Sequence, residues 1–251
     1  GTGVAQMTFT PSHQESFPRW SPDRTRVAYL RWDGTPVGQV CVAAVNSPQI
    51  PPTCLSIQVN GLNASSFGWA PDGASLLATI AGEVFRLTPP TTGLWYVEPV
   101  LQGGQAIHGN WIDISSAGQL ALSSGTTVDV GTVAGVATVF QLPAGHSDIS
   151  GLAWSPDGSK LAFHMKDGSG RAQVFVVNAD GTGLRQMTAY SAPFAALYPT
   201  WSPDGRKLAF TRHNASAFTQ DIMRVGLSGN GLTALTSVSS GTASAVPDWS
   251  N

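Results

Sequence analysis

The most regularly spaced carboxylates in this chain belong to a Pro-Asp pair that begins two residues after a tryptophan. They are Asp23, Asp72, Asp157 and Asp204. Carboxylate oxygens bind hard cations such as calcium, but an aspartate after proline also bonds to nearby backbone N–H groups and builds a tight turn. Because this aspartate recurs with a repeat, we expect it to build turns. Asp167 and Asp180, which each precede a glycine, are interpreted in the same way.

The other residues that could carry chemistry are scattered along the chain. The histidines are His13, His108, His146, His164 and His213. They form no His-x-x-x-His pair, and the chain has no Cys-x-x-Cys spacing, no Gly-x-Ser-x-Gly nucleophile elbow and no Gly-x-x-x-x-Gly-Lys phosphate loop. We therefore predict no catalytic residues and no metal-ligand set, and interpret the chain as a non-enzyme.

The two cysteines, Cys41 and Cys54, lie in strand-like segments on either side of the turn sequence NSPQIPP. If the two strands pair as a hairpin, the Cα atoms approach within the range that a disulfide accepts. The alternative is a pair of buried free thiols. A bridge would indicate an oxidising compartment.

The elements that position these residues follow from an internal repeat. Six of the eight tryptophans recur at intervals of roughly 45 residues, in the range of four-stranded propeller repeats. The clearest copies read FPRWSPDRTRVAYL, FGWAPDGASLLAT, LAWSPDGSKLAFH and YPTWSPDGRKLAFT, with degenerate copies at Trp111 and Trp249. Each copy predicts a strand ending near the tryptophan, a Pro-Asp-Gly turn and three further short strands. Such units bury both faces when they are arranged radially, so the sequence predicts an all-β propeller with the tryptophans between neighbouring sheets.

The repeat resembles that of the TolB-like β-propeller family. The family pattern is a Trp-Ser-Pro-Asp-Gly turn, a Lys-Leu-Ala-Phe type of strand and a later Asn-Ala-Asp-Gly turn. Residues 154–188, WSPDGSKLAFHMKDGSGRAQVFVVNADGTGLRQMT, carry it throughout, whereas the copy around Trp111 lacks the Pro-Asp-Gly turn. The resemblance extends over nearly the whole chain and implies one propeller domain, residues 1–251.

The strand count predicts six blades of four antiparallel strands. Five sets are complete, and two strands remain, at residues 3–8 and 245–249. In TolB-like propellers the two ends of the chain share the closing blade. By this resemblance we place both strands in a sixth, incomplete blade. The opening GTGVAQMT matches GTGLRQMT at 181–188, which follows a strand and a turn, so the chain is interpreted as a module of a longer polypeptide. The alternative is a five-bladed ring with two additional terminal strands.

Residues just before each tryptophan are the candidates for lining the central channel. They vary from copy to copy, whereas core positions should be alike. The candidates are Phe17, Arg19, Ser66, His108, Asn110, Tyr198, Thr200 and Asp248. In a closed six-bladed ring Asp248 would lie beside Arg19, either as a closing ion pair or as a ligand contact.

Composition restricts the partners. Charged residues are 11% of the chain and the formal charge is −2, so there is no basic field for nucleic acid. The sequence has no stretch of 18 or more apolar residues, so we expect no direct membrane insertion. We expect a non-catalytic binding or scaffold propeller that contacts a protein, peptide or glycan through its channel mouth and loops.

The resemblance adds two implications to this expectation. It implies a location outside the cytoplasm, whether periplasmic, secreted or at the cell surface. It implies a divalent cation such as calcium in the channel. The alternative function is the propeller part of a secreted enzyme, either the gating domain of a prolyl-oligopeptidase-like peptidase or a lyase with histidine ligands.

Overall fold

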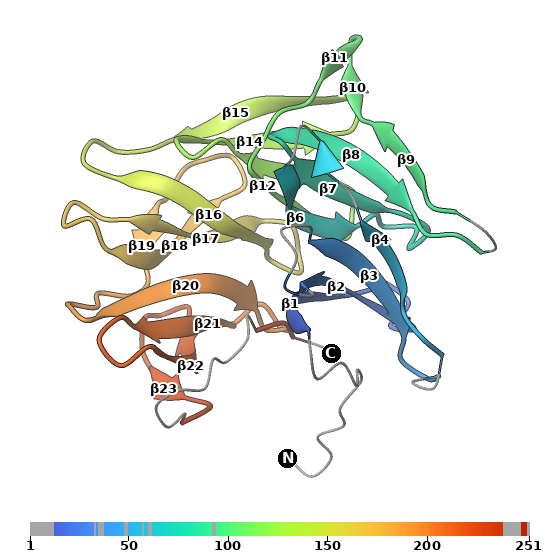
Figure 1. The fold of residues 1–251 in the computed structure, drawn as a ribbon. Coiled ribbons are helices and arrows are strands. Elements are labelled where there is room, and N and C mark those ends of the chain that lie inside the picture. The colour runs from blue at the N-terminus through green and yellow to red at the C-terminus, as the bar shows by residue number, and fades with distance from the viewer. Residues whose placement is uncertain are drawn as a thin grey trace.

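A computed structural model describes residues 13–32, 34, 38–47, 50–56, 58–59, 62–91, 94–237 and 247–249. All regular structure in these ranges is β-strand, and five antiparallel sheets of four or five strands are arranged around a central axis, with one additional two-stranded hairpin (Figure 1). No helix long and apolar enough to cross a membrane occurs among these residues. The fold is therefore an all-β propeller, and the part of the chain described here contains five blades.

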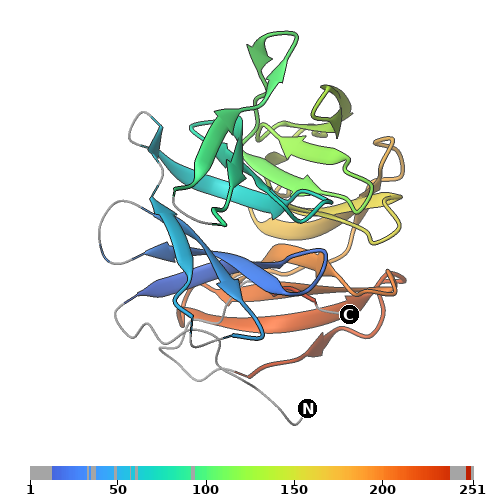
Figure 2. The ribbon, with the colours of Figure 1, turned by 90° about the vertical axis from the view of Figure 1, so that its right-hand side faces the viewer.

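The first and second blades follow one another along the chain. The first blade contains β1 (Gln14–Trp20), β2 (Arg26–Trp32), β3 (Gln39–Ala44) and β4 (Thr53–Ser56). The second contains β6 (Leu62–Trp69), β7 (Leu76–Ile80), β8 (Glu83–Thr88) and β9 (Tyr96–Pro99), with the short β5 (Gln58–Val59) added beside β6. Figure 2 shows the first blade, in blue, below the second, in cyan to green. A hairpin of β10 (Leu101–Gln102) and β11 (Gln105–Ala106) leads to the third blade.

The remaining three blades have the same meander topology, in which each strand pairs with the next along the chain. The third contains β12 (Trp111–Ile114), β13 (Leu120–Ser123), β14 (Thr127–Thr132) and β15 (Gly135–Gln141). The fourth contains β16 (Ser147–Trp154), β17 (Lys160–Lys166), β18 (Ala172–Asn178) and β19 (Arg185–Gln186). The fifth contains β20 (Phe194–Trp201), β21 (Lys207–Asn214), β22 (Thr219–Gly226) and β23 (Thr233–Ala234).

The aspartates of the repeat build turns, as their pattern predicts. Asp157 accepts hydrogen bonds from the Ser155 hydroxyl at 2.6 Å and from the Ser159 N–H at 3.1 Å. Asp23 and Asp204 make the same pair of contacts, and Asp72 accepts one from the Ala74 N–H at 2.8 Å. These donors lower the pKa of Asp157 to about 2, because they stabilise its ionised form. Each turn thus fixes the hairpin between the first two strands of its blade.

The repeated tryptophans join neighbouring blades. Trp69, Trp154 and Trp201 are only 5–6% exposed, and each packs in a core of apolar side chains between two sheets. The Trp69 indole N–H donates to the Arg19 carbonyl at 3.0 Å, and the Trp201 indole N–H donates to the Ala153 carbonyl at the same distance. Each bond therefore links a blade to the inner strand of the preceding blade, and the expected packing between sheets is confirmed.

The third blade corrects the sequence alignment. Trp154 lies opposite Leu161 and Trp201 opposite Leu208, and the corresponding pair in the third blade is Ile114 and Leu120. The Ser115 N–H donates to the Gln119 carbonyl as the Ser155 N–H donates to the Lys160 carbonyl, so the two turns occupy the same place in their blades, although that of the third blade is one residue shorter. Ile114, and not Trp111, therefore occupies the place of the repeated tryptophan. An apolar side chain fills the same core position, while Trp111 lies three residues earlier.

The sixth blade is not shown by the part of the chain that the structure describes, which has the five blades of the alternative prediction. One strand assigned to that blade, residues 3–8, lies outside the described residues. Of the other, 245–249, only 247–249 are described, and they are not assigned to a strand.

The two cysteines lie directly opposite each other on β3 and β4, with their Cα atoms 4.0 Å apart, and form a disulfide. Cys41 is fully buried in a small cluster with Tyr29 and Ala43. The bond fixes the two outer strands of the first blade to each other.

Candidate functional site

Irregular inner strands aim particular side chains at the channel. β1 has a bulge between Ser16 and Arg19, and β20 has one between Leu197 and Thr200. Within these bulges Phe17 has a φ of 55° and Tyr198 a φ of 52°, a left-handed conformation that aromatic residues rarely adopt. A bulge re-aims the side chain that it carries, and such backbone strain gathers at functional sites.

Three aromatic rings meet where these strands converge. The ring centroids of Phe17, Trp111 and Tyr198 lie 5.3 to 5.8 Å apart, and Phe17 meets Tyr198 edge-on. Trp111 comes from the third blade, which is next to neither the first nor the fifth, so the rings can meet only across the central channel. We call Phe17, Trp111 and Tyr198 the aromatic plug. Pairs with this geometry are stabilising beyond their buried area.

His164 supports the aromatic plug from the fourth blade. Its ring lies 5.0 Å from that of Tyr198, and its Nδ1 accepts a hydrogen bond from the Tyr198 N–H at 3.2 Å. Burial lowers the pKa of His164 to about 4, so the ring is neutral at pH 7. Gly151 makes room for it: a Cβ there would lie 2.7 Å from Nδ1 of His164. His164 is thus a buried structural histidine.

A cavity of about 310 Å³, which we call the axial pocket, lies at the end of the inner strands where the Pro-Asp turns begin. The first two blades, the third blade and the segment 247–249 surround it. Its lining consists of Arg19, Trp20, Pro22, Gly68, Trp69, Pro71, Asp113, Ile114, Ser115, Ser116, Asp248 and Trp249. This volume is at the lower end of the range for small-ligand sites.

Three charged side chains converge on the axial pocket. The Asp113 Oδ2 accepts the Trp154 N–H at 2.6 Å, and the Asp248 Oδ2 accepts the Trp20 N–H at 3.4 Å. Burial raises the pKa of Asp113 to about 6, against the opposing effects of the Arg19 guanidinium and of the Trp154 N–H. Burial also raises the pKa of Asp248, again opposed by Arg19. Both carboxylates are therefore poorly solvated.

Arg19 does not neutralise these carboxylates by direct contact. Its Nη1 donates to the Pro18 carbonyl at 3.2 Å, and no ion pair joins it to Asp113 or Asp248 in the described ranges. The pocket can therefore offer acceptors and a donor to a third group that enters it.

The structure places the candidates named from sequence at several different locations. Arg19 and Asp248 line the axial pocket together, and Phe17 and Tyr198 belong to the aromatic plug. Ser66 is buried, and its hydroxyl donates to the Ile112 carbonyl at 3.0 Å, so it joins the second and third blades. Thr200 is half-buried on β20.

His108 and Asn110 lie elsewhere. Both are exposed and precede β12, and His108 forms a β-bridge with Glu83 of the second blade. The equivalent inner-strand residues are Trp111 and Asp113, which sequence reasoning missed. The signal that identifies them is the hairpin sequence SSAGQLAL, which matches SPDGSKLAF with one residue fewer in the turn, once Ile114 is accepted in place of tryptophan.

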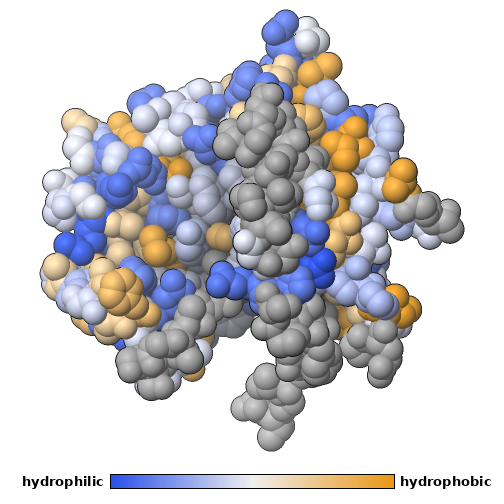
Figure 3. Space-filling view, viewed as in Figure 1, coloured by the Kyte–Doolittle hydropathy of each residue, from blue (hydrophilic) through white to orange (hydrophobic). Residues whose placement is uncertain are grey.

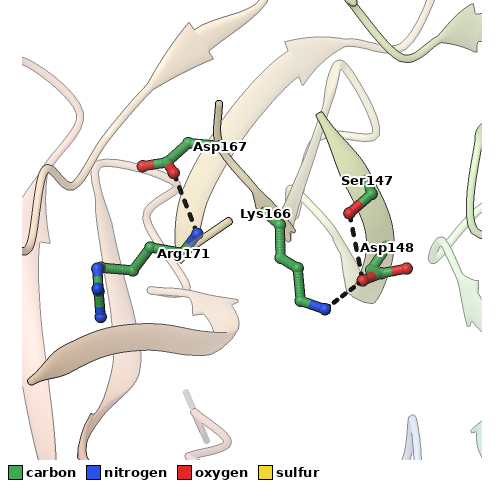
Figure 4. Close-up of polar contacts among 5 residues, drawn as sticks. All are labelled: Ser147, Asp148, Lys166, Asp167 and Arg171. Carbon is green, nitrogen blue, oxygen red and sulfur yellow. Dashed lines mark hydrogen bonds and ion pairs between the residues drawn. The ribbon is translucent and has the colours of Figure 1, made fainter. Parts of the chain in front are cut away.

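The opposite end of the fourth blade carries an exposed ion pair, far along β16 from Trp154. Figure 4 shows Lys166 reaching Asp148, with Nζ 2.6 Å from Oδ2, while Asp167 accepts the Arg171 N–H in the neighbouring turn. Both side chains of the ion pair are half exposed or more, so it contributes little to stability. Among the described residues no group of three His, Cys, Asp or Glu side chains is placed to hold a metal ion.

The comparisons with known proteins show the fold and no more. No family model matches the sequence. Coronin-7 of Bos taurus is 36% identical over 141 residues, which are 52% of this chain and 15% of that protein. The human Coronin-7 is 35% identical over 148 residues and 16% of its length is covered, so the chain spans less than a fifth of the curated relatives it matches.

Among solved structures, that of a putative TolB from Agrobacterium tumefaciens has a TM-score of 0.65 at 17% identity, over 92% of this chain and 83% of that chain. An oligogalacturonate lyase in complex with manganese has a TM-score of 0.59 at 14% identity, over 90% of this chain and 67% of that chain. The chain therefore has a TolB-like β-propeller fold.

Proposed function

We propose that this domain is a non-catalytic binding propeller, located outside the cytoplasm, whose axial pocket receives a side chain of a protein or peptide partner. The observation that carries the proposal is the axial pocket itself, in which Arg19, Asp113 and Asp248 surround a cavity without pairing directly with one another. A cavity of about 310 Å³ accommodates a side chain and not a folded element.

The location rests on the disulfide between Cys41 and Cys54. Disulfides form and persist in oxidising compartments and are rare in the cytosol. A secreted or periplasmic chain with this bond would meet partners outside the cell membrane, where a binding propeller presents its turns and channel mouth.

We further infer that residues 247–249 occupy the place of a sixth inner strand. Asp113 precedes Ile114, the tryptophan-equivalent residue of the third blade, and accepts the Trp154 N–H of the next blade. Asp248 precedes Trp249 and accepts the Trp20 N–H of the first blade in the same way. The repeated contact supports a ring in which the segment 247–249 stands immediately before the first blade.

The experiment that tests the proposed function selects peptides from a displayed random library on the immobilised protein. Gly68 is suited to a blocking variant, because its φ is not positive and a Cβ there would contact Ile114 Cδ1 at 3.4 Å within the pocket lining. We expect the selected peptides to lose binding to Gly68→Leu. They should still bind Gly168→Leu, which adds the same side chain to a turn with open space.

If selection yields no peptide whose binding depends on Gly68, the proposed function is wrong. Peptides that bind equally to both variants would also count against it, because they would bind another surface. One such surface is apolar: Leu94, Tyr96 and Leu101 are exposed on or beside β9 and β10. Figure 3 shows hydrophobic residues exposed on the right-hand side of the molecule, where Figure 1 places β9.

A further inference from the structure

The axial pocket has a charge pattern that selects among ligands. Two carboxylates, Asp113 and Asp248, come from segments far apart in sequence and face one cavity with a single guanidinium, that of Arg19. The hydrogen bonds that these carboxylates accept within the described residues come from backbone N–H groups, those of Trp154 and Ile114 at Asp113 and those of Trp20 and Trp249 at Asp248. Neither has a side-chain ion pair there. The lining therefore carries one negative charge that is not balanced when both aspartates are ionised.

The surroundings strengthen this preference. Taking two carboxylates partly out of water disfavours their charged forms unless an opposite charge is near. Trp20 and Trp249, both half-buried residues, belong to the same lining, and aromatic side chains attract cations. A cation that enters the axial pocket would thus lie among two aspartates and two tryptophans of the lining.

We propose, on the basis of the proposed function, that the axial pocket binds the ammonium or guanidinium group of a basic side chain between Asp113 and Asp248. Arg19 opposes this binding by its charge. It limits the affinity and excludes ligands that carry several positive charges in a small volume.

The test uses the whole chain and two blocked tripeptides. One is acetyl-Gly-Arg-Gly-amide, and the other carries citrulline, a neutral isostere of arginine, at the central position. Isothermal titration should show at least tenfold tighter binding of the arginine peptide, since hydrogen bonds to charged groups are about twice as strong as neutral ones. Asp113→Asn and Asp248→Asn keep the shape and the acceptor oxygen but remove the charge, and each should weaken the arginine peptide about tenfold.

Arg19→Gln provides a second, opposite readout. Removal of the opposing charge should tighten the binding of the arginine peptide several-fold. If Arg19 had only a structural role, its substitution would weaken this binding. Gly168→Leu serves as the control and should bind as the unchanged protein does. Far-ultraviolet circular dichroism of each variant verifies that the propeller is folded.

Several outcomes would overturn the proposal. Equal binding of the citrulline peptide, tighter binding by Asp113→Asn, or binding of calcium chloride or glucose without binding of the arginine peptide would each do so. Absence of any tripeptide binding would also overturn it. The proposed function fails only if, in addition, library selection finds no peptide that depends on Gly68. If the selected peptides depend on Gly68 but contain no basic residue, the proposed function stands and the proposal that the pocket binds a basic side chain is wrong.

Discussion

Trp154 and Trp201 allow the indole hydrogen bond between blades to be measured separately from indole burial. They occupy the same position in neighbouring blades and are 6% and 5% exposed. The Trp201 Nε1 donates to the Ala153 carbonyl, whereas the Trp154 Nε1 is buried without a hydrogen-bond partner among the described residues. Substitution by phenylalanine therefore removes nearly the same apolar area at both positions, but a hydrogen bond at only one.

The expected magnitudes follow from these contacts. The smaller ring should lower the free energy of unfolding by about 1–2 kcal/mol at either position, through lost burial and residual cavity. Trp201→Phe also leaves the Ala153 carbonyl without its donor, at a further cost of about 1–3 kcal/mol. Trp154→Phe removes a buried N–H that has no partner among the described residues. The removal of this unsatisfied donor offsets part of the stability that the variant loses through reduced burial. Trp201→Phe should thus be less stable than Trp154→Phe by about 2 kcal/mol.

Urea denaturation followed by far-ultraviolet circular dichroism measures this difference, because it does not depend on tryptophan fluorescence. The dependence of the free energy of unfolding on urea concentration should have the same slope in the two variants, so that the shift in midpoint reports stability alone. In thermal unfolding the difference should appear as a melting temperature about 4–8 °C lower for Trp201→Phe. Equal midpoints, or a lower midpoint for Trp154→Phe, would refute the reasoning that the indole bond holds the blades together.

Three further predictions concern the disulfide, a glycine and two buried titratable groups. Cys41→Ala together with Cys54→Ala should lower the free energy of unfolding by about 3 kcal/mol, given the separation of 13 residues, and reduction of the unchanged protein should produce the same midpoint shift in urea. Gly151→Ala should destabilise by more than 1 kcal/mol, because Gly151 has a φ of 63° and no space beside His164, whereas Gly168→Ala should be neutral in the same assay. His164, with its pKa lowered to about 4, binds its proton more readily when unfolded, so its contribution to stability is lost as the pH falls from 6.5 to 4. Asp113, with its pKa raised to about 6, binds its proton more readily when folded, so its contribution to stability falls as the pH rises from 4 to 6. The free energy of unfolding should therefore be measured as a function of pH across this range. Its slope against pH should change in opposite directions in His164→Gln and Asp113→Asn. A change in the same direction in both variants would contradict the two pKa assignments taken together.

The hairpin turns and the blade cores could be predicted from sequence because one chemistry recurs in them. Proline and aspartate fix the turn between the first two strands, and the residues after it alternate toward two buried faces. Wherever Trp-Ser-Pro-Asp-Gly is intact, as at Trp154 and Trp201, the expected hairpin is present. The number of blades was harder to predict, because sequence patterns suggested only two of the four strands of a sixth blade, and two separated patterns do not fix a register.

The third blade shows where pattern reading fails physically. Trp111 matches the repeat in residue type but not in position, because a core site accepts any apolar side chain of suitable shape and Ile114 fills it. Alignment on tryptophan therefore selected the exposed His108 and Asn110 in place of Trp111 and Asp113. Alignment on the turn and on Leu120 would have avoided this, since the backbone hydrogen bonds of a hairpin allow no shift of one residue without turning every side chain to the other face.

The site arises at the positions that the repeat does not fix. Residues one and three places before the tryptophan lie on the inner strand, so each blade has two positions near the axis on which turn chemistry places no demand. Two of these positions are glycines with consequences that can be traced. Gly68 carries no side chain into the lining of the axial pocket, and Gly151 leaves the space that His164 fills. A larger residue at position 68 would fill the pocket in which Arg19, Asp113 and Asp248 converge, so the binding capacity proposed for this propeller depends on one missing side chain as much as on three charged ones.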